Sequence, residues 1–101
     1  MIEISPKNLE TVKKILKQYV QNYKVVAFGS RVSQTAKSYS DLDLAIIGKK
    51  RISSVVLFHL KSAFQESDLP FRVDILDWHT ISEPFKNIIS EKHIVLQEPS
   101  P

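Results

Sequence analysis

Two aspartates, Asp41 and Asp43, open a strongly apolar segment, ten residues after the Gly-Ser pair at positions 29 and 30. On a β-strand, side chains two residues apart project from one face, with their Cα atoms about 7 Å apart. Burying charge beside the apolar run Leu44–Ile47 is costly unless a counter-ion is present. The spacing therefore predicts a strand that presents a pair of carboxylates to a cation.

The same stretch supplies both parts of a metal–triphosphate site. Mg²⁺ prefers oxygen ligands, keeps some of its waters and takes phosphate oxygens as further ligands. A Gly-Ser turn lets the backbone approach a ligand closely and offers N–H groups and a hydroxyl to a phosphate. We therefore expect Gly29 and Ser30 to bind phosphate, and Asp41 and Asp43 to bind Mg²⁺.

This stretch resembles the signature of the DNA polymerase β-like nucleotidyltransferase superfamily, in which G-S is followed after about ten residues by D-x-D. Within that superfamily it is similar to the minimal nucleotidyltransferases (MNT proteins). Many members carry a glycine before the Thr-Ala pair, where this chain has Gln34. The residues that match the signature are Gly29, Ser30, Arg31, Thr35, Ala36, Ser40, Asp41, Leu42, Asp43 and Leu44.

Length and composition are those of one small globular domain. We assign residues 1–98 to a single nucleotidyltransferase domain and residues 99–101 to a frayed tail. The chain is 43% hydrophobic and 25% charged, which is ordinary for a soluble protein. It has no cysteine, which excludes disulfides and zinc-thiolate sites.

Other composition features argue against a membrane or nucleic-acid protein. The longest apolar runs, such as Leu44–Ile47, are too short to span a bilayer. No apolar signal segment follows the first residues, so we expect a cytoplasmic location. The net charge of +3 is mild, and no basic stripe is interleaved with aromatic residues, which argues against nucleic-acid binding.

Apolar periodicity predicts an α/β fold, a small mixed sheet of three or four strands flanked by helices. In the second helix we place Val55 on the buried side and Phe58 in the core. The expected helices run from Pro6 to about Asn22, over about residues 52–66, and through 85–89 with Thr80 or Ser82 as the cap; the expected strands are Lys24–Phe28, Asp41–Ile47, Phe71–Trp78 and a short segment at 93–96; residues 31–40 form a short helix or loop.

A third acid is expected on a strand next to Asp43. Two candidates, Asp74 and Asp77, lie on opposite faces of the third predicted strand. Leu76 and Trp78 share the face of Asp74, which is unlike an exposed polar row. The resemblance implies an acid in mid-strand among apolar residues, and this matches Asp74. Asp77 lies at the strand end, where loop and cap residues are common, and remains the alternative.

The resemblance also implies an activity: Mg²⁺-dependent transfer of AMP from ATP to a hydroxyl group of a partner protein. One or two Mg²⁺ ions would bridge the triphosphate, and Asp74 would accept the proton of the attacking hydroxyl. Arg31 is either a phosphate ligand or an ion-pair partner that sets the loop. The implied catalytic and metal-binding residues are Asp41, Asp43 and Asp74, and the nucleotide-binding residues are Gly29, Ser30 and Arg31.

A chain this short has little surface with which to select an acceptor, so we expect a partner chain or a homo- or hetero-oligomer. MNT proteins are typically paired with HEPN-domain toxins, and the resemblance implies an antitoxin that neutralises its toxin by adenylylation, commonly at a tyrosine. Two alternatives are an antitoxin that masks its partner by contact alone, and an enzyme that nucleotidylates a small molecule. The clustered carboxylates favour an enzyme, because masking has no physical need for them.

Overall fold

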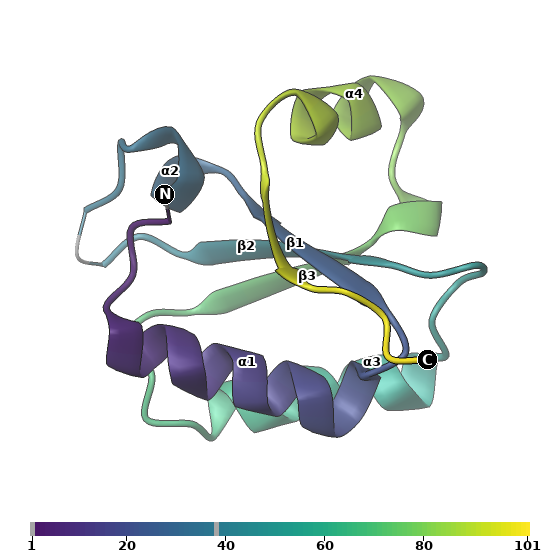
Figure 1. The fold of residues 1–101 in the computed structure, drawn as a ribbon, viewed down its shortest axis with the longest axis horizontal. Helices are drawn as coiled ribbons and strands as arrows, with labels where there is room; N and C mark the ends of the chain where they lie inside the picture. Colours follow the sequence, from purple (N-terminus) through teal and green to yellow (C-terminus); the bar gives the residue numbers. More distant parts are fainter. Residues whose placement is uncertain (1, 38) are drawn as a thin grey trace.

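The computed structural model describes residues 2–37 and 39–101, which form a four-stranded mixed sheet flanked by helices (Figure 1). The architecture predicted from the sequence is confirmed. In chain order the elements are α1 (Pro6–Val20), β1 (Lys24–Phe28), α2 (Ser30–Ser33), β2 (Leu42–Ile47), α3 (Ser54–Gln65), β3 (Val73–Asp77), the 3₁₀ turn η1 (Trp78–Thr80), α4 (Glu83–Glu91) and β4 (Ile94–Gln97).

The strand order in the sheet is β3-β2-β1-β4. Strand β1 is antiparallel to both of its neighbours, whereas β2 and β3 run parallel to each other. A parallel pair needs a crossover connection, and α3 lies in the connection between β2 and β3. Strands β2 and β3 therefore begin at the same end of the sheet, and the residues at their starts lie side by side.

Serine side chains determine where three helices begin. The Oγ atoms of Ser5, Ser53 and Ser82 each accept a hydrogen bond from the backbone N–H three residues later, at 3.2, 3.1 and 3.3 Å. Proline follows in the first turn of α1 and α4, where no N–H donor is required. Ser82 rather than Thr80 is thus the cap of α4, and α3 begins at Ser54 rather than at residue 52.

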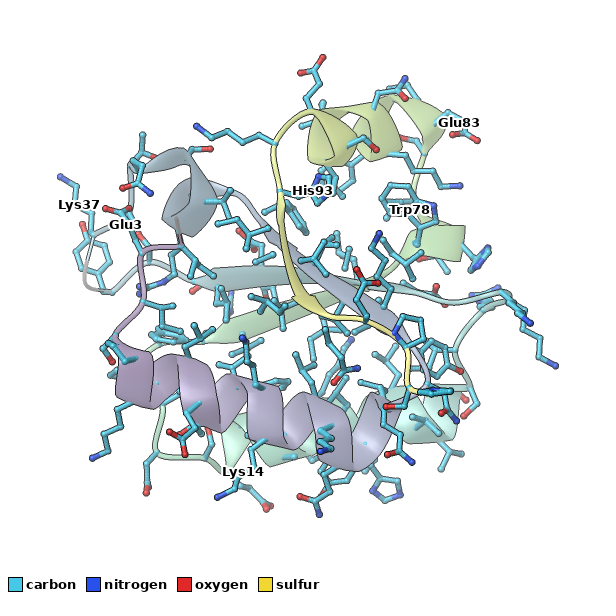
Figure 2. The ribbon with its side chains drawn as sticks, in the orientation of Figure 1. Glu3, Lys14, Lys37, Trp78, Glu83 and His93 are labelled. Atoms are coloured by element: carbon cyan, nitrogen blue, oxygen red, sulfur yellow. The ribbon has the colours of Figure 1, made fainter. Side chains whose placement is uncertain are left out.

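The two faces of the sheet are covered unequally. Helices α1 and α3 pack side by side over one face (Figure 1), where Leu16 of α1 and Leu60 of α3 are buried with Leu44 of the sheet. Helix α4 covers only part of the other face, where Phe28 and Trp78 are partly buried; Trp78 is labelled in Figure 2. Ile89 of α4 is buried together with Val26 and Ala45 of the sheet. The starts of β2 and β3 on this second face are left open to polar side chains.

Two residues expected in the core lie at the surface. Val55 is 64% exposed and Phe58 is 65% exposed. The buried stripe of α3 follows Leu60 and Phe64, and the helical spacing turns Val55 and Phe58 away from it. The sequence prediction grouped Val55 with Ile52, but Ile52 precedes the Ser53 cap and lies outside the helix.

Both ends of the described chain contact the domain. The backbone N–H of Glu3 donates to the carbonyl of Arg31 at 2.7 Å. In the segment expected to fray, the N–H of Ser100 donates to the carbonyl of Gln21 at 2.9 Å. Across residues 2–37 and 39–101, no helix has the length and apolar character needed to cross a membrane.

Candidate active site

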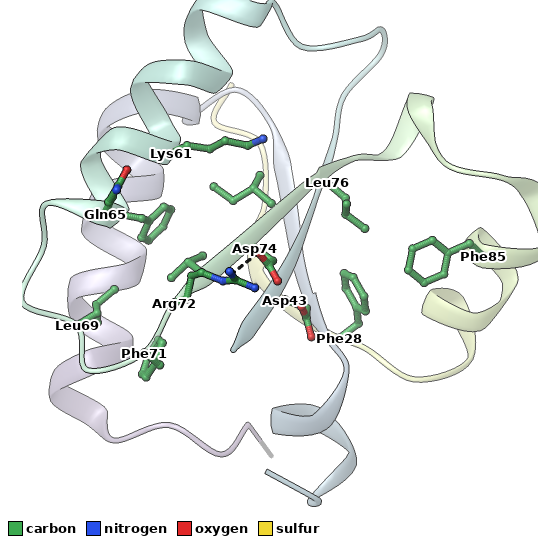
Figure 3. A pocket seen from close by; sticks show the side chains of 13 residues that line it. Phe28, Asp43, Lys61, Gln65, Leu69, Phe71, Arg72, Asp74, Leu76 and Phe85 are labelled. Atoms are coloured by element: carbon green, nitrogen blue, oxygen red, sulfur yellow. Dashed lines mark ion pairs between the residues drawn. The ribbon is translucent and has the colours of Figure 1, made fainter. Parts of the chain in front are cut away.

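Three carboxylates come together where β2 and β3 begin. Asp43 and Asp74 are register partners on these parallel strands, and Asp41 lies one residue before β2 on the face of Asp43. All three belong to the sheet face that α4 covers only in part. Figure 3 shows the side chains of Asp43 and Asp74 next to each other, at the mouth of a cavity. The structure therefore unites the three predicted acids.

Arg72 is the counter-ion of this cluster. Its Nη2 atom lies 2.9 Å from Asp41 Oδ2, and its Nε atom lies 3.6 Å from Asp74 Oδ1. The hydrogen bond to Asp41 raises the pKa of Arg72, and the charges of Asp41 and Asp74 add to this. Arg72 is not among the site residues predicted from the sequence. The spacing in the sequence could have indicated it, because Arg72 precedes Asp74 by two residues and so shares its face of the strand.

Asp43 is partly buried and has an acidic neighbour on each side. Partial burial raises its pKa, and the negative charges of Asp74 and Asp41 raise it further, while Arg72 opposes them. The cluster therefore holds more negative charge than one arginine offsets. This excess charge favours an additional cation at Asp43.

The Gly-Ser turn lies directly against the side chain of Asp43. Gly29 has φ of 82°, in the left-handed region where glycine alone is unstrained. A β-carbon at Gly29 would overlap with the Asp43 carboxylate. Ser30 follows as the first residue of α2, and the carbonyl of Gly29 accepts hydrogen bonds from Val32 and Ser33. The expected phosphate-binding turn and the expected metal-binding strand are thus in contact.

Arg31 is buried beside this turn, with 6% of its surface exposed. Its Nε and Nη2 atoms donate to the Ser40 carbonyl at 3.0 and 2.8 Å, and Nη1 donates to the Glu3 carbonyl at 2.7 Å. The guanidinium also lies over the Phe71 ring, 4.3 Å from its centroid. These contacts favour the second of the two sequence interpretations, in which Arg31 sets the loop, although backbone carbonyls serve here as partners.

Glu3 completes the support of the loop. Its Oε2 atom accepts a hydrogen bond from the Ala36 N–H at 3.1 Å, in addition to its two backbone contacts with Arg31. Within the same loop, the Lys37 N–H donates to Ser40 Oγ at 2.9 Å. The segment that leads from the turn to Asp41 is therefore held by side chains from both of its ends and from the N-terminal segment.

Asp77 lies on the opposite face and is not part of the cluster. It is 5% exposed, and its two carboxylate oxygens accept hydrogen bonds from the N–H groups of Ile52 at 2.9 Å and His79 at 3.0 Å. Asp77 thereby caps η1 and ends β3 before Trp78. Of the two candidates for the third acid, the structure brings Asp74 to Asp43 and gives Asp77 a structural contact.

A cavity of about 830 Å³ opens beside the carboxylates. Its polar end holds Asp43, Arg72 and Asp74, and its apolar wall includes Phe28 and Phe85, whose rings pack edge to face with centroids 5.8 Å apart (Figure 3). The cavity is large enough for a small organic ligand, since such sites commonly measure about 300–1,000 Å³.

The donor set fits a magnesium ion that is bound together with a nucleotide. Among the residues that the structure describes, no three acidic or histidine side chains are gathered closely enough to enclose a metal. Magnesium is usually bound by one or two carboxylates, several waters and substrate phosphates, rather than by an all-protein cage. An open carboxylate cluster in contact with a Gly-Ser turn meets that requirement.

The chain matches a known family and a named relative. The family model described as Polymerase beta, Nucleotidyltransferase matches residues 10–100. A protein of Haemophilus influenzae named "Probable protein adenylyltransferase MntA" is 53% identical over 97 residues, which cover 96% of this chain and 85% of that protein.

Two solved structures show the same fold. A crystal structure described as the toxin-antitoxin with AMP-PNP superposes with a TM-score of 0.74 at 20% identity, covering 92% of this chain and 74% of the matched chain. A structure of the tri-AMPylated Shewanella oneidensis HEPN toxin in complex with MNT antitoxin gives a TM-score of 0.68 at 20% identity, covering 93% and 71%.

Proposed function

Because this chain belongs to the polymerase beta nucleotidyltransferase family, and within it to the minimal nucleotidyltransferases, we propose that it transfers AMP from ATP to a hydroxyl group of a partner protein. The observation that carries this proposal is the convergence of Asp41, Asp43 and Asp74 on one sheet face, against the Gly29-Ser30 turn. The 53% identical relative is named as a probable protein adenylyltransferase, which supports a protein acceptor.

The acids and the Gly29-Ser30 turn divide the tasks of this reaction between them. Asp41 and Asp43 would hold Mg²⁺, with Asp74 as a further ligand, and the ion would supply positive charge next to the triphosphate. The Gly29-Ser30 turn holds the β- or γ-phosphate through N–H groups and the Ser30 hydroxyl. The acceptor oxygen forms a bond to the α-phosphorus, the bond from that phosphorus to pyrophosphate breaks, and Asp74 takes the hydroxyl proton.

The partner we propose is a HEPN-domain toxin, which the chain would neutralise by adenylylation in the cytoplasm, where ATP is present. Structures with the same fold are described as toxin–antitoxin complexes, one with AMP-PNP and one with a tri-AMPylated HEPN toxin. The open face beside α4 supports this assignment, because a bare metal–triphosphate platform needs a second protein to present the hydroxyl.

The test is to incubate the chain with ATP, Mg²⁺ and the HEPN-domain protein encoded beside it, and to measure the intact mass of that protein. We expect additions of one or more AMP units with the wild-type chain and none with Asp43→Asn. Asp68→Asn, the same substitution at an exposed position outside the cluster, is the matched control and should transfer AMP normally. A partner that is inhibited without any gain in mass would show masking by contact and would contradict the proposal.

A further inference from the structure

Strand β3 has an open edge next to the candidate active site. It is the outer strand of the sheet on that side, with β2 as its neighbour. The N–H of Leu42 donates to the carbonyl of Arg72 at 2.9 Å. This bond determines which residues of β3 direct their backbone groups toward β2. In such a ladder alternate residues bond to the neighbour, so Arg72 and Asp74 turn their backbone groups toward β2. Val73 and Ile75 turn theirs toward the outside.

A groove runs along this edge. The cavity at the carboxylates and a second cavity of about 740 Å³ share three lining residues, Lys61, Ile75 and Leu76. The first cavity reaches Asp74, and the second continues past Leu76 to Arg51 and Thr80. Lys61 and Gln65 of α3 lie on one side of β3 and Phe85 of α4 lies on the other (Figure 3). We call this surface the edge groove, formed by Arg51, Lys61, Gln65, Leu76, Thr80 and Phe85.

We propose that the edge groove binds the acceptor polypeptide as an added β-strand, with its hydroxyl-bearing residue opposite Asp74. The proposal rests on the function proposed above. Exposed sheet edges bind extended peptides through main-chain hydrogen bonds, and alternate side chains then point to opposite faces of the sheet. Since β3 is five residues long, or about 17 Å, a short extended segment would span it and leave one side chain directed at the carboxylates.

The charges of the groove indicate what kind of segment it prefers. Lys61 and Arg51 are exposed along it, and Arg72 lies at the end that holds the carboxylates. Once a cation and a nucleotide occupy Asp41, Asp43 and Asp74, the rest of the groove presents positive charge. An acceptor segment with an acidic residue a few positions from its tyrosine or serine hydroxyl therefore fits best.

The absence of cysteine from the chain allows a direct test, because a single introduced cysteine can be labelled uniquely. Lys61→Cys places a label in the edge groove. Lys14→Cys is the matched control, since Lys14 is exposed on α1, on the side of the molecule away from α4 (Figure 2). Each variant is coupled to a polyethylene glycol maleimide and assayed with ATP, Mg²⁺ and the HEPN-domain protein encoded beside the chain. ATP affinity is measured separately by calorimetry.

The label at position 61 should lower AMP transfer at least about tenfold, and the label at position 14 less than about twofold, with ATP affinity unchanged in both. In the complex of the unlabelled chain with the same protein, hydrogen exchange should slow at the N–H groups of Val73 and Ile75. Normal transfer by the chain labelled at 61, or blocked transfer without slower exchange, overturns the added strand.

The outcomes also separate this proposal from the proposed function. Loss of ATP affinity on labelling position 61 would mean that the nucleotide occupies the groove, which overturns the proposal. If the wild-type chain transfers AMP and the label at position 61 has no effect, the proposed function stands and the proposal that the edge groove binds the acceptor is wrong. Slower exchange at Val73 and Ile75 without any AMP transfer keeps the groove as a docking site and removes the proposed function.

Discussion

The α-carbon of Gly29 lies so close to the Asp43 carboxylate that the structure has no space for a β-carbon between them. The two residues come from the two halves of the sequence signature, and their contact is where the turn meets the strand. Both the positive φ of Gly29 and this contact require glycine.

Gly29→Ala should therefore destabilise the chain by about 1–3 kcal/mol, because it adds backbone strain and displaces the Asp43 carboxylate. AMP transfer per folded molecule should fall by about 10²-fold or more, the scale seen when a reacting group is misplaced. Urea unfolding and single-turnover rates measure the two effects. Gly48→Ala is the control: its β-carbon would meet the Tyr23 ring, away from the cluster, so stability should fall but transfer per folded molecule should not.

Asp43→Asn should abolish transfer and stabilise the metal-free chain at neutral pH. The folded chain raises the pKa of Asp43, so it binds that proton more tightly than the unfolded chain does. Stability is therefore lost as pH rises from the ordinary value of 3.8 through the raised value in the folded state. The asparagine variant lacks this loss. Denaturant unfolding in EDTA at pH 3 and pH 7 should show a gap between variant and wild type that opens with pH; an equal gap at both values would contradict this.

Arg72→Gln should strengthen Mg²⁺ binding in the absence of nucleotide. Arg72 already pairs with Asp41 and Asp74, so its positive charge competes with an added cation. We expect affinity to rise roughly two- to fivefold at low ionic strength and the gain to shrink with added salt, because the guanidinium is exposed. Titration calorimetry against Arg51→Gln, an exposed arginine outside the cluster, measures this. Weaker binding would mean that Arg72 orders the carboxylates rather than neutralising them.

Asp74→Asn and Asp77→Asn should separate chemistry from stability. Asp74→Asn keeps the other acids and the Gly29-Ser30 turn, so Mg-ATP should still bind while transfer falls by about 10²-fold or more, the scale for removal of a general base. Asp77→Asn should instead lower stability by about 1–3 kcal/mol, because an amide group can accept only one of the two buried N–H bonds. Calorimetry, single-turnover rates and urea unfolding compare the pair; an inactive but stable Asp77→Asn would reverse the assignment.

Gln34 should tolerate glycine but not valine. It has φ of 64° at the end of α2, in the left-handed region, where the resembling family often has glycine. Gln34→Val should cost about 1–2 kcal/mol, because a β-branched residue is strained there. Gln34→Gly should unfold at the same urea concentration as wild type or slightly above. Equal stability of the valine variant would place the strain elsewhere in the loop.

The sequence predicted the strands, and the shared face of Asp41 and Asp43, because both depend on short-range spacing. An i, i+2 pair such as Asp41 and Asp43 shares a face on any strand, and Ser5 or Ser82 caps a helix through bonds three residues away. The exposure of Phe58 was not predictable in this way. Helix α3 has more apolar residues than one buried stripe can hold, and only packing against the sheet and α1 selects Leu60 over Phe58.

The contacts of Arg31 also could not be predicted from the sequence, because they again depend on the tertiary fold. Its partners, Glu3 and Ser40, are 28 and 9 residues away, and they offer backbone carbonyls, which every residue type has. No pattern of side chains in the sequence could therefore predict these two carbonyl partners. Asp77 shows the same limit, since its bond to the Ile52 N–H spans 25 residues.

The hydrogen bonds of Glu3 to Arg31 and Ala36 tie the N-terminal segment to the loop that follows the Gly29-Ser30 turn. Opening of this segment would free Arg31 Nη1 and the Ala36 N–H together, while the bonds from Arg31 to Ser40 remain. The order of the loop after the Gly29-Ser30 turn therefore depends in part on residues that lie before the first helix. Fusion tags and fluorescent labels attached just ahead of Glu3 would act on the turn itself. An affinity handle belongs after β4 instead, where the chain passes Gln21, at the end of β1 opposite to the Gly29 turn.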